Sequence, residues 1–217
     1  MASERARTNG GGPYRGLLID WGGVMTGDPF VSFKAFCEQE GLEPDTIRQR
    51  FREDRACRDL LIALETGAVA EEEFEPQFAE QLGINGDGLI NRLFALSAVQ
   101  DRMVAAVARA RQAGIRTGLI SNSWGTRRYN RPLLAELFDG IVISGEVGMR
   151  KPTSEIYTLG AQRIGLEPPE CVFVDDLPFN LEPAAELGMA TVLHVSADET
   201  IPELERLLDV ELESPGG

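Results

Sequence analysis

The sequence has little of what disulfide-bonded proteins and zinc proteins depend on. Its 217 residues include three cysteines and one histidine. The cysteines, Cys37, Cys57 and Cys171, are odd in number and widely spaced, and no two of them form a Cys-x-x-Cys pair. This pattern argues against a disulfide framework and against a zinc site. We therefore expect three small thiols, buried or half-buried, in a reducing compartment.

Long apolar runs and positive charge are scarce as well. No stretch approaches the ~18 consecutive apolar residues of a membrane span, and residues 1–13 are polar and glycine-rich, unlike a signal peptide. The chain has 21 Lys and Arg against 35 Asp and Glu, which gives a formal net charge of −14. Because nucleic acids and anionic membranes attract basic surfaces, we expect neither as a partner. These observations predict a soluble, cytoplasmic protein.

The stretch from Gly16 to Thr26 carries the first positive signal. It reads Gly-Leu-Leu-Ile-Asp-Trp-Gly-Gly-Val-Met-Thr, a short apolar run that ends in Asp20 and two glycines. This is typical of a buried parallel strand that stops where its backbone approaches a ligand closely. In open α/β sheets ligands bind at that edge, so Asp20 is a candidate for chemistry. Taken alone, an aspartate that caps a turn or a helix explains the pattern equally well.

The next segment, residues 30–98, has the spacing of helices. Its apolar residues recur at three- and four-residue steps, as in Phe33, Phe36 and Cys37, and turn signals such as Gly67 and Gly83 divide it. We expect about four helices and no strand. A helical insertion directly after a strand that ends in a candidate catalytic residue indicates a lid over the site. The alternative is that these helices only complete the core.

From Val99 onwards helices and strands alternate, which predicts an α/β fold with a doubly wound parallel sheet. We take residues 14–29 and 99–212 as this core, and residues 1–13 and 213–217 as disordered tails. The expected strands are 115–120, 141–144, 171–174 and 190–195, and the expected helices are 103–113, 131–137, 154–164, 181–187 and 201–208.

Polar clusters follow the later strands. Ser121-Asn122-Ser123 and Asp175-Asp176 each end a strand, and Arg150-Lys151-Pro152 precedes the helix between them. We expect these groups to converge on Asp20. Their chemistry suits phosphoryl transfer, in which a carboxylate attacks phosphorus, a hydroxyl and backbone N–H groups hold the phosphoryl oxygens, a lysine neutralises charge, and further acids bind Mg²⁺.

In this order the clusters resemble four motifs of the haloacid dehalogenase (HAD) superfamily of phosphotransferases. They are Leu-Leu-Ile-Asp20-Trp-Gly-Gly-Val, Leu-Ile-Ser121-Asn-Ser, Gly-Met-Arg-Lys151-Pro and Val-Phe-Val-Asp175-Asp176-Leu-Pro-Phe-Asn180-Leu-Glu-Pro-Ala. From Thr117 through Val192 the chain is especially similar to the N-terminal phosphatase domain of soluble epoxide hydrolases. The resemblance implies a Rossmann-like core and makes residues 30–98 a small helical cap over the site.

The resemblance also implies a role for each matching residue. Asp20 is then the nucleophile that becomes a phosphoaspartate, and Lys151 pairs with it and with the phosphate. Ser121, Gly22 and Gly23 bind the phosphoryl group, and Asn122 shapes the substrate pocket.

The implied cofactor is Mg²⁺. Asp176 matches the principal metal ligand, and Asp175 is a second or supporting ligand. Asp20 and the backbone carbonyl of Gly22 complete the set of ligands that the protein supplies. Milder interpretations of these residues are turn formers for Ser121 and Asn122, a solvated lysine at position 151, and a helix N-cap at Asp175-Asp176.

One position departs from the family pattern. Where many family members have a second aspartate that acts as general acid and base, this chain has Gly22. Loss of such a group costs on the order of 10²–10⁴ in rate. The implied function is a slow or selective Mg²⁺-dependent phosphatase of a small phosphorylated metabolite, with Asp28, Asp175 or a cap residue as substitute acid. The alternatives are a non-catalytic protein that binds a phosphorylated ligand, and a dehalogenase, which needs no metal.

Several residues are left with two interpretations. Trp124 either walls the pocket or packs at the junction of core and cap. Arg127, Arg128 and Arg131 either steer an anion or form a solvated helix face. His194 is interpreted as structural, and a homodimer is left open.

Overall fold

A sheet of five parallel strands forms the centre of the molecule. The computed structural model describes residues 14–213, and in it the strands lie in the order β3-β2-β1-β4-β5. The first strand is central, because it pairs in parallel with β2 on one side and β4 on the other. This confirms the predicted α/β parallel sheet. The bounds are β1 Gly16–Ile19, β2 Arg116–Ser121, β3 Gly140–Ile143, β4 Cys171–Asp175 and β5 Ala190–Leu193.

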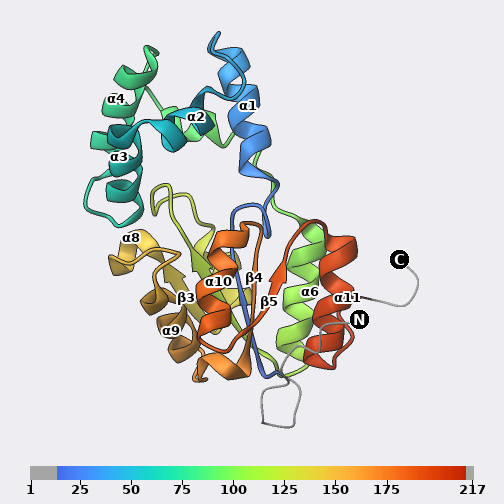
Figure 1. Ribbon diagram of the computed structural model, residues 1–217. Helices are drawn as coiled ribbons and strands as arrows, with labels where there is room; N and C mark the ends of the chain where they lie inside the picture. Colours follow the sequence, from blue (N-terminus) through green and yellow to red (C-terminus); the bar gives the residue numbers. More distant parts are fainter. Residues whose placement is uncertain (1–13, 214–217) are drawn as a thin grey trace, which may run out of the picture.

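Helices cover both faces of this sheet (Figure 1). Side chains alternate along β1, so Leu17 and Ile19 belong to one hydrophobic cluster and Leu18 to the other. Both clusters are fully buried at these positions, and the sheet is therefore doubly wound. The first cluster is closed by α6 (Asp101–Gln112), α7 (Arg131–Leu137) and α11 (Ala197–Leu208), and the second by α9 (Ser154–Arg163) and α10 (Pro178–Glu186).

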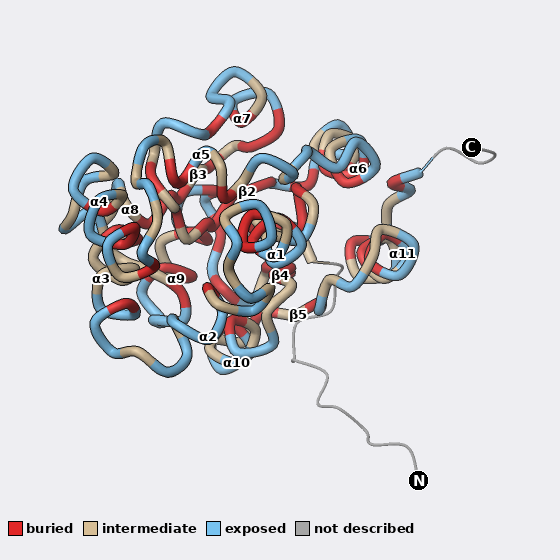
Figure 2. Tube along the Cα trace, turned by 90° about the horizontal axis from the view of Figure 1, so that it is seen from above, coloured by how far each residue is buried: buried red, intermediate tan, exposed pale blue. Residues whose placement is uncertain are grey.

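The helical insertion lies beyond the carboxyl ends of the strands, with its own hydrophobic cluster (Figure 1). It contains five helices where the sequence predicted about four, since the last of them, with five residues, is too short to show periodicity. Figure 2 looks down on this layer, with α1 above the central strands. The helices are α1 Pro29–Gln39, α2 Thr46–Glu53, α3 Arg55–Glu65, α4 Glu71–Leu82 and α5 Leu89–Leu93. The limits 30–98 for a separate cap stay a prediction.

The two segments that join this insertion to the core run side by side. Thr26 and Val99 form an antiparallel bridge, and the Gly27 N–H donates to the Ala98 carbonyl at 2.9 Å. Asp28 then caps α1, because its carboxylate accepts from the Phe30 N–H at 2.8 Å. The chain thus leaves and re-enters the core at one place.

Some boundaries differ from the predicted ones. Helix α10 begins at Pro178 rather than at 181, since proline is favourable at the first helical position. Helix α11 begins at 197 rather than 201, because the Ser196 hydroxyl accepts from the Glu199 N–H. The sequence also missed α8 (Ser144–Val147) and a short 3₁₀ helix (Pro168–Glu170).

Of the predicted disordered tails, the structure describes one residue. Glu213 is described and pairs with Arg102 at 2.8 Å, whereas residues 1–13 and 214–217 lie outside the described part of the chain. Among residues 14–213, no helix combines the length and apolar character needed to cross a bilayer.

Candidate active site

The predicted site residues meet at the carboxyl ends of three adjacent strands. Asp20 directly follows β1, Ser121 ends β2 and Asp175 ends β4. All three side chains are buried. The Asp20 N–H donates to the Val174 carbonyl at 2.9 Å, which extends the strand pairing up to the candidate nucleophile. After β3 the chain passes to the other half of the sheet, where β4 lies beside β1. In α/β proteins, the crevice at such a reversal of strand order is where ligands bind.

Lys151 lies between two of these carboxylates. Its Nζ is 2.7 Å from Asp20 Oδ1 and 2.6 Å from Asp175 Oδ2, and its side chain is 1% exposed. The turn that carries it is fixed by Asn122, whose side chain donates to the Lys151 carbonyl (3.0 Å) and accepts from the Lys151 N–H (2.8 Å). Asn122 therefore positions the lysine as well as lining the cavity.

Burial governs the protonation of this cluster. Desolvation and the nearby Asp175 together raise the pKa of Asp20 to about 8, against the opposing effect of Lys151. Desolvation and the nearby Asp175 also raise the pKa of Asp176, to about 6. Although burial alone would lower the pKa of Lys151, its two carboxylate partners raise it, and the lysine is therefore charged. A cation among the aspartates would favour their ionised forms.

The acidic cluster fits a divalent metal ion. Ligand oxygens of Asp20, Asp175 and Asp176 lie within 4.8 Å of one another, and an all-oxygen set of this kind suits Mg²⁺. Asp175 is already engaged, since it accepts from Lys151, from the Leu177 N–H and from the Asn180 amide. Asp176 is half-buried, and among residues 14–213 no other residue donates a hydrogen bond to its carboxylate; its role as principal ligand stays a prediction.

Two further observations support a polar ligand here. Asn180 Oδ1 is buried with no hydrogen-bond partner among the described residues, and Asn180 lines the same cavity. Gly23, with φ of 76°, lies so close to Asp176 that an added Cβ would come within 2.4 Å of Asp176 Oδ2. The loop after β1 is therefore in direct contact with the predicted metal ligand.

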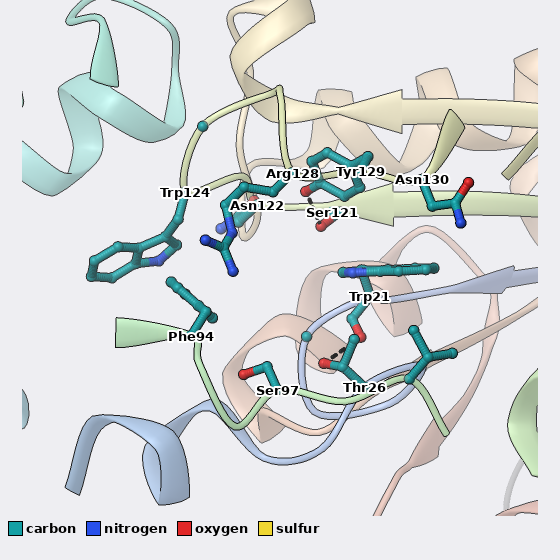
Figure 3. A pocket seen from close by; sticks show the side chains of 13 residues that line it. Trp21, Thr26, Phe94, Ser97, Ser121, Asn122, Trp124, Arg128, Tyr129 and Asn130 are labelled. Atoms are coloured by element: carbon teal, nitrogen blue, oxygen red, sulfur yellow. Dashed lines mark hydrogen bonds between the residues drawn. The ribbon is translucent and has the colours of Figure 1, made fainter. Parts of the chain in front are cut away.

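Ser121 has a partner that the sequence did not indicate. Its Oγ is 2.8 Å from the Tyr129 hydroxyl, in the loop before α7 (Figure 3). Burial raises the pKa of Tyr129, so its phenol is neutral. Either hydroxyl can donate in this contact; when the Tyr129 phenol donates to Ser121 Oγ, the Ser121 proton is available for a ligand. A lone loop tyrosine carries no periodic signal that could have predicted this.

Two cavities adjoin these residues. One, of about 370 Å³, has Asp20, Lys151 and Asp176 on its core side and residues of α1, α2 and α3 on its cap side. The other, of about 180 Å³, lies beside Ser121 and Tyr129. The two share Gly22, Phe94, Asn122 and Trp124 as lining residues.

Gly22 has no side chain at the position where many family members carry the general acid and base, but the structure has room for one there. An added Cβ would contact only Pro29, at 3.5 Å. Of the substitutes named from the sequence, Asp28 is engaged as the cap of α1 and Asp175 in the contacts with Lys151 and Asn180. A cap residue that the sequence did not single out, Glu65 at the end of α3, lines the larger cavity.

Glu65 is a buried carboxylate with one strong partner. Its Oε2 is 2.5 Å from Arg150 Nε, and its side chain is 6% exposed. Burial raises the pKa of Glu65, whereas Arg150 lowers it. This ion pair connects α3 to the turn that carries Lys151.

Trp124 fulfils both interpretations offered for it. Its ring lies 5.3 to 5.8 Å from those of Phe33, Phe51, Phe74 and Phe94 in the cap cluster, and it lines both cavities.

The three arginines that follow Trp124 in the sequence, which were considered as one basic cluster, have different surroundings in the structure. Arg127 pairs with Glu72 at 2.8 Å and with Glu71 at 3.3 Å, and Arg131 pairs with Glu146. Of the three, Arg128 alone lines one of the two cavities described above, and Figure 3 shows its guanidinium between Trp124, Phe94 and Trp21. His194 bonds to the Thr200 hydroxyl at 2.8 Å, away from both cavities, as a structural residue would.

The chain is similar to an epoxide hydrolase and to phosphatases over part of its length. Over 117 residues it is 36% identical to bifunctional epoxide hydrolase 2 of Sus scrofa, which covers 51% of this chain and 21% of that protein. Over 112 residues it is 30% identical to glyceraldehyde 3-phosphate phosphatase of Methanocaldococcus jannaschii, covering 45% and 49% of the two chains. The chain thus aligns with about a fifth and about half of these curated relatives.

Solved structures and a family model cover most of the chain. A HAD family enzyme from Bacteroides thetaiotaomicron, solved as a magnesium complex, shares the fold with a TM-score of 0.67 at 22% identity, over 90% of this chain and 100% of that one. The model of the haloacid dehalogenase-like hydrolases matches residues 14–188. With its parallel sheet and its aspartates and lysine at the strand ends, the chain belongs to the haloacid dehalogenase-like hydrolase family.

Proposed function

We propose that this protein is a Mg²⁺-dependent phosphatase that hydrolyses small phosphate monoesters through a phosphoaspartyl intermediate on Asp20. The observation that carries the proposal is the contact of Lys151 Nζ with Asp20 and Asp175, beside a third carboxylate, at one end of a substrate-sized cavity. The similarity to phosphatases, among them a glyceraldehyde 3-phosphate phosphatase and a fructose-1-phosphate phosphatase, supports the reaction class.

In the first step Asp20 attacks the phosphorus atom and the ester P–O bond breaks. Lys151 holds Asp20 by Oδ1 and neutralises charge that develops on the phosphoryl oxygens. Ser121 donates to a phosphoryl oxygen, with its hydroxyl oriented by Tyr129. Bound Mg²⁺, held by Asp20, Asp176 and the Gly22 carbonyl, would shield the anionic nucleophile from the anionic substrate.

In the second step water attacks the phosphoaspartate, inorganic phosphate leaves and Asp20 is regenerated. With Gly22 in place of an acid, the alcohol leaves as an anion or takes its proton from solvent. We therefore expect slow turnover that favours good leaving groups such as aryl and acyl phosphates.

The test combines turnover with trapping. The protein is incubated with Mg²⁺ and either 4-nitrophenyl phosphate or acetyl phosphate, and released phosphate and borohydride-trapped phosphoaspartate are measured. Asp20→Asn should abolish both signals, because the amide cannot attack phosphorus. The matched control is Asp59→Asn, at an exposed position on α3, which should leave both unchanged.

Gly22 favours one alternative, a protein that binds a phosphorylated ligand without hydrolysing it. That alternative predicts thermal stabilisation by Mg²⁺ and inorganic phosphate with neither turnover nor trapped intermediate. Such a result from folded protein would replace the phosphatase by the binding function.

A further inference from the structure

Helix α2 presents cationic and aromatic side chains to the catalytic cavity. Arg48, Phe51 and Arg52 all line it, at the i, i+3 and i+4 spacing of one helix face. They lie on the cap side, whereas Asp20, Lys151 and Asp176 lie on the core side. A ligand held at Asp20 would therefore extend toward two guanidinium groups.

Among the residues that the structure describes, these two guanidinium groups have no carboxylate partner. Within residues 14–213, neither Arg48 nor Arg52 forms an ion pair, whereas Arg50, on another face of the same helix, reaches Asp54 at 3.7 Å. Like charges one helical turn apart repel each other. In a chain with an excess of acidic residues, two adjacent unpaired arginines over a cavity are available to an anion.

The walls of the cavity between these charged groups are aromatic. Phe33, Phe51, Phe94 and Trp124 line it, and Phe30 and Phe179 lie at it with 39% and 56% of their surface exposed. Arg48 is held over the Phe30 ring, 5.3 Å from the centroid. Exposed aromatic groups around a cavity are typical of a surface that an apolar ligand covers.

We propose that Arg48 and Arg52 bind a second anionic group of the substrate, so that the substrate is a phosphate monoester with an apolar, preferably aromatic, body and a distal carboxylate or phosphate. The proposal rests on the proposed function, because it places the first phosphate at Asp20. Guanidinium groups suit both kinds of anion, since they bind carboxylates and phosphates through paired N–H donors.

Non-hydrolysable ligands test this subsite apart from turnover. The probes are 4-phosphonobenzoate and its neutral analogue 4-phosphonobenzamide, together with the corresponding biphenyl pair to vary the length. Affinities are measured by calorimetry in the presence of Mg²⁺. For at least one length, the carboxylate should bind about tenfold more tightly than the amide, because the charged group gains hydrogen bonds from arginine.

The double variant Arg48→Gln/Arg52→Gln should reduce this preference to about twofold or less, while the amide keeps its affinity and so shows that the cavity is intact. Arg55→Gln is the matched control: it removes one positive charge from the neighbouring helix at a side chain that is 87% exposed and outside the cavity. It should leave the preference unchanged.

The outcomes separate the two proposals. Equal affinity for carboxylate and amide at both lengths, or a preference that survives in the double variant, would overturn the subsite even if 4-nitrophenyl phosphate is hydrolysed. A preference that the double variant abolishes, in a protein that hydrolyses no phosphate ester, would support the subsite and overturn the phosphatase.

Discussion

Gly22 and Gly23 are adjacent and yet constrained differently. Gly23 has φ of 76° and leaves no room for a Cβ beside Asp176, whereas a Cβ at Gly22 would make one ordinary contact. Only the second glycine is therefore required by the backbone and by the predicted metal ligand.

Gly23→Ala should cost about 1–2 kcal/mol of unfolding free energy, because an alanine is strained at positive φ. It should also weaken Mg²⁺ binding, since the new methyl group displaces the Asp176 carboxylate. Urea unfolding and Mg²⁺ titration measure the two effects. Gly22→Ala is the control and should change neither by much; an equal loss in both variants would contradict this account.

The raised pKa values at the site predict how Mg²⁺ stabilisation depends on pH. Between its ordinary value of 3.8 and about 8, Asp20 binds more protons in the folded than in the unfolded chain, so the stability of the metal-free protein falls as pH rises through this range. Metal ions bind the deprotonated carboxylates, so Mg²⁺ binding strengthens over the same range.

The melting temperature gained on adding Mg²⁺ should therefore be larger at about pH 8 than at about pH 5.5. Differential scanning fluorimetry at the two pH values checks this. Asp20→Asn removes one of the titrating groups and should reduce the dependence to the part that Asp176 contributes. A gain that is largest at the lower pH would show that these aspartates do not bind the ion.

At the scale of the elements, one buried ion pair joins the cap to the core. Glu65, at the end of α3, pairs with Arg150, one residue before the lysine that contacts Asp20. Gly67, just beyond, lies so close to the Gly145 carbonyl that a Cβ would come within 2.4 Å of it. The cap therefore touches the core on the side of α8 as well as at its covalent connection.

Removal of one member of this pair leaves the other buried without compensation. Glu65→Gln or Arg150→Gln should cost about 2 kcal/mol of unfolding free energy, less than for a fully buried pair because Arg150 is 25% exposed. The double variant should lose clearly less than the sum of the two. Urea unfolding of all three measures the coupling.

The comparison for this pair is Arg127→Gln, which breaks the more exposed contacts with Glu71 and Glu72. It should cost at most about 0.5 kcal/mol. If it destabilises the protein as much as Glu65→Gln, burial is not the reason for the effect.

Features that depend on residues close together in the sequence could be predicted, whereas features that depend on contacts formed by the fold could not. The strands were recognised because apolar runs such as Cys171 to Val174 alternate with helical spacing, and Asp20 and Asp175 stand directly at the ends of such runs. Glu65 was missed because its contact joins segments far apart in the chain. Tyr129, in a loop eight residues after Ser121, was missed because a single loop tyrosine carries no periodic signal. Arg127 and Arg131 have carboxylate partners from α4 and α8, which only the fold brings near.

Across the whole molecule, the core and the cap differ in how completely their elements are buried from solvent. In the core, β1 is fully buried between two strands and two helical layers. In the cap, Ile47 is the only buried residue of α2. Local opening should therefore cost much less free energy in α2 than in β1.

Amide hydrogen exchange measured by mass spectrometry tests this difference. Peptides that cover α2 should exchange first and those that cover β1 last, with the remaining cap helices between them. Equal protection of α2 and β1 would mean that the cap and core unfold as one unit.

Trp124 belongs to the core by sequence, after β2, and to the cap by packing, among four phenylalanines. The hydrophobic cluster of the insertion is therefore not formed by its own residues alone. A cap grafted from a relative onto this core would meet a foreign indole at its centre, and this cap moved elsewhere would lack one. A cap transfer meant to exchange substrate preference between family members must therefore include position 124. Substitutions in the cap and substitutions in the loop after β2 are also expected to depend on one another through this residue.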